Sequence, residues 1–141
     1  MLIEKILYRA QVKATASRDI RVVSSDGALD LEVTRPRDMG CTNGRATSPE
    51  QLFAAGYAAC FLGIMRFVAG RESIELPKGT EVEASVGVGL RPRGFGIEVE
   101  LRIFLPGLPR AEADPLVKKS HLLCPYSNAG RGNISVRLVL A

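Results

Sequence analysis

The sequence has no tryptophan, one histidine, three cysteines and few aromatic residues. Because aromatic residues make up only 6% of the chain, the core has to be built mainly from Leu, Val, Ile and Ala. The 46% of hydrophobic residues and 24% of charged residues are typical of a globular protein and argue against a disordered chain. A chain of 141 residues suits one domain, so we expect a single domain over residues 1–141.

Other signals are also missing. The Lys and Arg residues form no dense basic run with interleaved aromatic residues, which argues against a nucleic-acid partner. The longest uncharged run, Gln51 to Met65, falls short of the ~20 residues that cross a bilayer. Glu4, Lys5 and Arg9 interrupt the first apolar stretch, so no export signal is expected. We therefore expect a cytoplasmic protein whose thiols stay reduced.

The hydrophobic pattern predicts an α+β fold with antiparallel strand pairing. Alternating apolar and polar residues predict strands at Ile3–Ala14, Ile20–Val23, Leu29–Val33, Glu81–Leu90, Ile97–Leu105 and Ile134–Leu140. The dipeptide Asp26-Gly27 predicts a hairpin turn. Two helices are expected, Pro49–Ala69 and Asp114–Leu123.

The first of these helices is apolar on nearly every side. Ser48 suits its N-cap, Pro49 its first position and Gly70 its end. A helix that is hydrophobic all round needs cover on several sides, more than one small sheet can supply. We therefore expect a homodimer that buries this helix between subunits.

The three cysteines lie in different surroundings. Cys60 sits mid-helix in PEQLFAAGYAACFLGIM, where a thiol is either inert packing or a nucleophile shielded from water. Cys124 ends the second helix in the polar turn CPYSNAGRGN, a place that packing explains less easily. Cys41 lies in a glycine-rich loop and is interpreted as a bystander.

Two chemistries suit such thiols. A Cys₃His metal site could draw on His121, Cys124, Cys41 and Cys60, but no CxxC pair supports it. The alternative is thiol redox catalysis. Burial raises a thiol pKa, so the nucleophile needs a fixed cation nearby, and lowering the pKa by ~3 units takes ~4 kcal/mol. An arginine held by a carboxylate can supply this, and Glu50 is a candidate carboxylate. Composition alone does not show which of the arginines would stabilise the thiolate.

SPEQLFAAGYAACFLG together with CPYSNAGRGNISV resembles the organic hydroperoxide resistance proteins of the OsmC/Ohr superfamily. The resemblance extends over essentially the whole chain, including RDIRVVSSDGALDLEVTRPRDMG. It implies a thiol-dependent peroxidase in which Cys60 is the peroxidatic and Cys124 the resolving cysteine. Arg18 matches the arginine that activates the thiolate, and Glu50 matches the carboxylate paired with that arginine.

The resemblance also implies the fold and the partners. The family fold is an intertwined α+β homodimer with antiparallel sheets wrapped around long central helices and two active sites at the interface. The implied reductant is a dihydrolipoyl group on a lipoylated protein, and no metal or flavin cofactor is implied. Local departures from the family pattern include Pro115 within a usually helical stretch, Gly130 in place of a common Thr, and Cys41 in a glycine-rich loop.

An apolar pocket around Cys60 would favour alkyl or lipid hydroperoxides over hydrogen peroxide. Phe61, Met65 and Phe95 are candidate walls of that pocket, although each also suits a plain core position. Two other functions remain open: an OsmC-type peroxidase with a broader peroxide range, and a non-catalytic domain that binds an apolar ligand.

Overall fold

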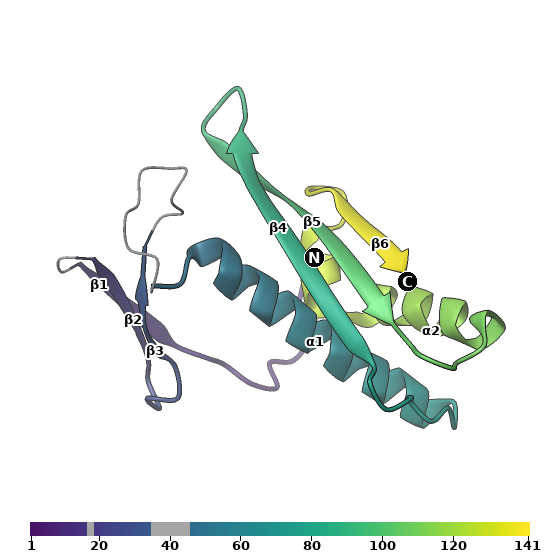
Figure 1. Cartoon of the computed structure of the whole chain (residues 1–141). Helices are drawn as coiled ribbons and strands as arrows, with labels where there is room; N and C mark the ends of the chain where they lie inside the picture. The colour runs from purple at the N-terminus through teal and green to yellow at the C-terminus, as the bar shows by residue number, and fades with distance from the viewer. Residues whose placement is uncertain (17–18, 35–45) are drawn as a thin grey trace. The chain divides into compact units, whose positions relative to one another are not determined.

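The computed structural model of the chain describes residues 1–16, 19–34 and 46–141 (Figure 1). Arg18 and Cys41 therefore lie outside the described residues. The chain divides into two compact units, Met1–Pro49 and Glu50–Ala141, each with its own sheet. The expected single domain stays a prediction.

The first unit contains a three-stranded antiparallel sheet in the order β1-β2-β3. Its strands are β1 (Val12–Ala16), β2 (Ile20–Ser24) and β3 (Asp30–Val33). The predicted turn joins β2 to β3, with Gly27 at φ +75°, a left-handed conformation that glycine adopts without steric cost. The Asp26 carboxylate accepts hydrogen bonds from the Ser24 hydroxyl and the Ala28 amide, which close the turn.

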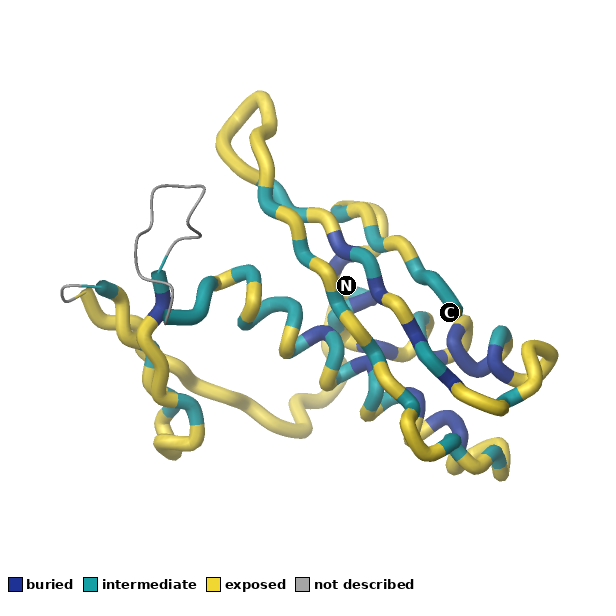
Figure 2. Tube along the Cα trace, in the orientation of Figure 1, coloured by how far each residue is buried: buried dark blue, intermediate teal, exposed yellow. Residues whose placement is uncertain are grey.

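The predicted strand Ile3–Ala14 is wrong over most of its length, because the ordered strand is β1 and residues 1–11 form no strand. This segment is instead exposed along its length (Figure 2). Its exposed large apolar side chains are Met1, Leu2, Ile3, Ile6, Leu7 and Tyr8. An extended segment becomes a strand only when a neighbouring strand accepts its backbone hydrogen bonds. Alternation in the sequence indicates that a segment can be extended, but it does not reveal whether the same chain supplies a strand beside it.

The second unit contains a three-stranded sheet in the order β4-β5-β6. Its elements are α1 (Pro49–Arg71), β4 (Glu81–Leu90), β5 (Phe95–Phe104), α2 (Arg110–Leu123), α3 (Pro125–Gly130) and β6 (Val136–Leu140). β4 and β5 form the predicted antiparallel hairpin, turned at Gly94 with φ +84°. β6 instead runs parallel to β5, which corrects the all-antiparallel expectation for this strand.

The core lies between one face of this sheet and the helices α1 and α2. Alternate residues of β5, namely Val99, Leu101 and Ile103, are buried, as the two-residue period of a strand requires. They belong to one cluster with side chains from α1 and α2: Tyr57, Phe61, Met65, Val68, Ala69, Ala113, Leu116 and Val117. The mixed α+β class is therefore confirmed.

Helix α1 begins at the predicted Pro49 and runs two residues past the predicted end. Glu50 in its first turn and Arg71 in its last turn complement the helix dipole. One stripe of α1 stays exposed in the single chain, with residues about four apart: Gln51, Ala55, Ala59, Gly63 and Phe67. Most of this stripe is apolar or small, as the pattern predicted.

Two boundaries near the second cysteine differ from expectation. Helix α2 begins at Arg110 rather than Asp114, so Pro115 lies inside the helix. Pro115 is exposed and its ring removes one backbone hydrogen bond, whereas burial of Leu116 and Val117 holds the helix against the core. The turn after Cys124 is also helical, because Pro125 begins the short helix α3.

Candidate active site

Two thiols meet where α1 passes the junction of α2 and α3. The Cys124 thiol donates to the Cys60 sulfur, with 4.0 Å between the two sulfur atoms. Cys124 is fully buried, and Cys60 is partly exposed. The fold therefore brings together the two cysteines that the sequence singled out, across 64 residues of chain.

The dipeptide Cys124-Pro125 places the second thiol. A residue before proline disfavours the helical conformation, and Cys124 is extended with φ −67° and ψ 125°. Proline then suits the first position of α3, where its missing N–H costs nothing. The Cys124 amide donates to the Ser120 carbonyl, and its carbonyl accepts from the Asn128 amide, so both helix ends fix its backbone.

The described surroundings of Cys60 disfavour its thiolate. Burial is the main cause that raises the pKa of Cys60 to about 11, followed by the charge of Cys124 and the hydrogen bond with Cys124. A backbone hydrogen bond from Tyr126 lowers this pKa by a smaller amount. At neutral pH these groups leave Cys60 as a thiol, so an active nucleophile needs a further positive charge.

Glu50 occupies the first turn of α1 and is partly buried. Its buried Oε2 atom has no hydrogen-bond partner among the described residues. A buried carboxylate oxygen without a partner is costly, so this position suits a cation. Glu50 precedes Cys60 by ten residues on one helix, which separates their Cα atoms by about 15 Å along the axis. Helix α1 alone therefore does not bring them together.

Three aromatic rings form a cluster at the N-terminal half of α1, and this cluster was not predicted from the sequence. Tyr57 and Tyr126 stack with ring centroids 5.4 Å apart, and Phe53 meets both rings edge-on. Gly56 makes room for Tyr126, because a Cβ atom at Gly56 would lie 2.3 Å from the Tyr126 hydroxyl oxygen. The glycine in AAGYAAC was the available signal for this close approach.

His121 takes part in hydrogen bonding with Ser127. Its Nδ1 lies 2.8 Å from the Ser127 hydroxyl oxygen, and that oxygen also lies 2.7 Å from the Tyr57 hydroxyl. Within residues 1–16, 19–34 and 46–141, no three His, Cys, Asp or Glu side chains gather as a metal site would require.

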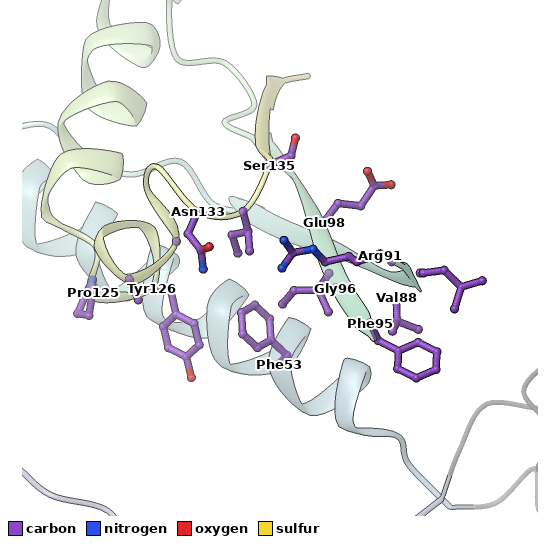
Figure 3. Close-up of a pocket in the computed structure, with 17 residues that line it drawn as sticks. Phe53, Val88, Arg91, Phe95, Gly96, Glu98, Pro125, Tyr126, Asn133 and Ser135 are labelled. Carbon is purple, nitrogen blue, oxygen red and sulfur yellow. The ribbon is translucent and has the colours of Figure 1, made fainter. Parts of the chain in front are cut away.

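An open groove of about 1000 Å³ lies beside the motif CPYSNAGRGN that begins with Cys124 (Figure 3). Phe53 and Tyr126 form one side of it, and the β4–β5 hairpin forms another. Of the three predicted pocket residues, Phe95 lines this groove, whereas Phe61 and Met65 are fully buried in the core.

Comparison with known proteins decides the family. Residues 42–139 match the model of the family described as OsmC-like protein. The chain belongs to the OsmC-like protein family. An organic hydroperoxide resistance protein from Xanthomonas axonopodis pv. citri is 55% identical over 138 residues, which cover 98% of this chain and 97% of the relative. The predicted relationship to organic hydroperoxide resistance proteins is thereby confirmed.

Solved structures of OsmC-like proteins share the fold. An organic hydroperoxide resistance protein from Legionella pneumophila has a TM-score of 0.90 and 43% identity, covering 97% of this chain and 99% of that one. Another, from Elizabethkingia anophelis, has a TM-score of 0.91 and 43% identity, covering 97% and 98%. By length and composition alone α1 could cross a membrane, but in this soluble OsmC-like fold it is the core helix.

Proposed function

We propose that this chain is a thiol-dependent peroxidase that reduces organic hydroperoxides to alcohols. Family membership supports a role in peroxide detoxification. The observation that carries the finer proposal is the 4.0 Å approach of the Cys60 and Cys124 sulfurs. Two thiols at this separation can form a reversible disulfide. Pro125 and Tyr126, which directly follow Cys124, line an open groove.

In the first step, the Cys60 thiolate attacks the distal oxygen of the hydroperoxide. An S–O bond forms and the O–O bond breaks, and the leaving alkoxide takes a proton to become the alcohol. Cys60 becomes a sulfenic acid, so its sulfur loses two electrons and the peroxide gains them.

In the second step, the Cys124 sulfur attacks the sulfenic acid sulfur of Cys60. An S–S bond of about 2.05 Å forms as the S–O bond breaks. The leaving hydroxide takes the proton of the Cys124 thiol and departs as water. In the reduced protein that thiol already donates toward Cys60, so sulfur and proton both face the reacting centre.

Arg18 and Glu50 are proposed to activate Cys60, on the basis of the family resemblance. The described surroundings raise the Cys60 pKa, and a guanidinium that keeps its charge in a dry site would lower it. The Oε2 atom of Glu50, which has no hydrogen-bond partner among the described residues, supports a cation at the start of α1. In this assignment Arg18 stabilises the thiolate, and Glu50 orients Arg18 through charge-assisted hydrogen bonds.

The groove beside the cysteine motif supports organic rather than inorganic peroxides as substrates. Its apolar lining includes Phe53, Phe95 and Ile97. An alkyl or lipid tail gains roughly 25 cal/mol for each Å² of apolar surface removed from water, and hydrogen peroxide has no such tail.

A dihydrolipoyl dithiol, carried on a lipoylated protein or as dihydrolipoamide, is the proposed reductant. One of its thiolates attacks the Cys60–Cys124 disulfide, forms a mixed disulfide and releases one cysteine. Its second thiol then attacks the mixed disulfide, closes the lipoyl ring and releases the other cysteine. The dithiol thus supplies the protein with two electrons, which replace the two that the peroxide gained. A cycle that needs reduced cysteines suits the cytoplasm, the location we propose.

A homodimer is the proposed assembly. The exposed stripe on α1 and the exposed apolar segment of residues 1–8 both present surface that a second copy would cover. The 15 Å helical spacing between Glu50 and Cys60 supports sites shared between subunits, because one subunit could supply Glu50 to the Cys60 of the other. A single sedimenting species with the mass of one chain at micromolar concentration would overturn the dimer.

The decisive experiment is to treat the reduced protein with cumene hydroperoxide and measure its mass. We expect a loss of two hydrogens and a 60–124 crosslink on peptide mapping. Cys124→Ser should stop at a Cys60 sulfenic acid, and Cys60→Ser should not react. Cys41→Ser is the matched control and should behave as the unmodified protein. An unchanged mass would instead support a non-catalytic domain that binds apolar ligands.

Turnover measurements separate the remaining alternatives. We expect turnover with dihydrolipoamide and little with a thioredoxin system. Cumene hydroperoxide should be preferred over hydrogen peroxide. Equal rates with both peroxides would favour the OsmC-type peroxidase of broader range.

A further inference from the structure

Ser127 connects three helices through one buried hydroxyl group. Its oxygen lies 2.7 Å from the Tyr57 hydroxyl on α1 and 2.8 Å from His121 Nδ1 on α2, while Ser127 itself belongs to α3. Ser127 and Tyr57 are both fully buried. A serine hydroxyl has one hydrogen to donate and can accept, so both contacts are satisfied at once.

The direction of these hydrogen bonds follows from the state of His121. Burial lowers the pKa of His121, and the charge of Arg131 lowers it further, so the ring is neutral at neutral pH. With the ring proton on Nε2, Tyr57 donates to Ser127 and Ser127 donates to Nδ1. The opposite tautomer reverses both bonds and leaves both satisfied. In either case, removal of the Ser127 hydroxyl deprives two side chains of a partner.

This connection spans the same two segments that carry the thiols. Tyr57 precedes Cys60 by three residues on α1, and Ser127 follows Cys124 by three residues. Tyr126 adds a second contact, because its ring stacks on Tyr57. The hydroxyl link therefore lies within about one helical turn of each sulfur.

The α2 side of the link is held as well. The guanidinium of Arg131, just after α3, donates to the His121 carbonyl oxygen at 2.8 Å and to the Asn128 side chain. His121 is therefore fixed from both its backbone and its ring. A polar network of this kind specifies one arrangement of packed helices, which apolar side chains of similar size would define less strictly.

We propose that Ser127, bonded to Tyr57 and His121, is a positioning residue that holds the Cys124 segment against α1 and so sets how readily Cys124 reaches Cys60. This inference rests on the proposed function. Of the two cysteines, the first step of that reaction uses only Cys60, whereas disulfide formation requires the two sulfurs to close from 4.0 Å to bonding distance. Loss of the link should therefore slow the second step and spare the first.

The test compares Ser127→Ala with Ser120→Ala. Ser120 is an equally buried serine, but its hydroxyl donates to the Leu116 carbonyl of its own helix. With cumene hydroperoxide in stopped flow, oxidation of Cys60 should be equally fast in both variants and the unmodified protein. Disulfide formation should be about tenfold slower in Ser127→Ala alone, the effect of losing one to two buried hydrogen bonds at the reacting geometry. Dimedone should accordingly trap more Cys60 sulfenic acid in that variant.

Tyr57→Phe is the second variant, because it removes one hydrogen bond and keeps the ring in the core. It should slow disulfide formation in the same direction by a smaller factor, and it decides the question if Ser127→Ala does not fold. Disulfide formation at the unmodified rate in the folded variants would overturn the proposal. So would equal slowing by Ser120→Ala, since that would reflect general loosening of the core.

A redox equilibrium separates this inference from the proposed function. The Cys60–Cys124 pair is equilibrated with oxidised and reduced dithiothreitol, without any peroxide. The equilibrium constant for disulfide formation should fall about tenfold in Ser127→Ala, because the reduced sulfurs spend less time close together. If hydroperoxide fails to oxidise the unmodified protein, the peroxidase proposal fails while this measurement still tests Ser127. An unchanged constant would overturn the positioning role alone.

Discussion

The sulfur atoms of Cys60 and Cys124 lie 4.0 Å apart, with the Cys124 thiol donating toward Cys60. One sulfur comes from the middle of a long helix, and the other comes from the extended residue between two helices. This arrangement leaves the pair one short movement from a disulfide. Burial first, and the Cys124 thiol second, raise the Cys60 pKa to about 11, so a reactive thiolate at residue 60 needs a further positive charge.

The first prediction concerns the ionisation of Cys60 and Arg18. Without the arginine, burial alone should keep the Cys60 pKa above its usual value even where serine replaces Cys124, whose charge and hydrogen bond contribute the rest of the rise to about 11. In Arg18→Ala the alkylation rate of Cys60 should therefore rise about tenfold for each pH unit through pH 9, because the thiolate fraction does. In the unmodified protein the rate should level off below pH 7. Bromobimane kinetics in a Cys124→Ser, Cys41→Ser background measure this.

Arg21→Ala is the control for that experiment. Arg21 lies on β2 and pairs with Asp30 in an exposed ion pair, so its removal should leave the Cys60 profile unchanged. If Arg18→Ala and the unmodified protein show the same profile, Arg18 does not activate the thiol.

The second prediction concerns Glu50→Gln. This change keeps the shape of the side chain but removes the charge that is proposed to hold Arg18. We expect kcat/KM for cumene hydroperoxide to fall at least about tenfold, since charge-assisted hydrogen bonds are worth more than neutral ones. Glu72→Gln is the matched control, because Glu72 is bound by Lys119 just beyond the far end of α1. Equal activity of both variants would remove Glu50 from the mechanism.

The third prediction concerns the close packing of Gly56 against Tyr126. An alanine Cβ would lie 2.3 Å from the Tyr126 hydroxyl oxygen, so Gly56→Ala must displace that ring. Alanine gains about 1 kcal/mol of helix propensity, and the overlap should cost about 1–3 kcal/mol, so a net loss of stability is expected. Urea unfolding measures the difference. Gly70→Ala has nothing within 4 Å of its Cβ and should be neutral or stabilising, and Tyr126→Phe should partly rescue Gly56→Ala.

The fourth prediction concerns sites shared between subunits. A mixture of Cys60→Ser chains with Glu50→Ala chains should regain peroxidase activity after unfolding and refolding together. In a mixed dimer one site would combine an intact Cys60 with an intact Glu50 from the other chain. Activity should approach about a quarter of that of the unmodified protein, because half of the dimers are mixed and each has one intact site. No gain over the separately refolded variants would place both residues of a site in one chain.

Much of the second unit could be predicted from the sequence. Val82 and Ile103 face each other in the β4–β5 hairpin, whose alternation was visible because one face of the sheet is buried. The start of α1 was visible because Pro49 favours a first helical turn. Helix α3 was missed, since CPYSNAGRGN is polar and rich in turn formers, and only its Pro125 indicated a helix start.

Some residues of the candidate site could also be predicted from the sequence, and others could not. Cys60 and Cys124 were singled out because long motifs surround them, and the structure brings them together. Tyr57 and Ser127 carried no signal, because a tyrosine in an apolar helix and a serine in a polar turn are ordinary residues. Their hydrogen bond joins positions 70 residues apart, which no local pattern encodes. Arg18 lies outside the described residues, so its role stays a prediction.

The sequence by itself determined the strands and helices whose burial repeats with a regular period, and its motifs determined the family. Those features depend on near neighbours along the chain, and periodicity reports them directly. Only the tertiary structure decided that α2 tolerates Pro115, that β6 runs parallel to β5, and that one serine ties the two thiol-bearing segments together. Each of these depends on contacts between distant segments, where the free energy of packing outweighs local preference.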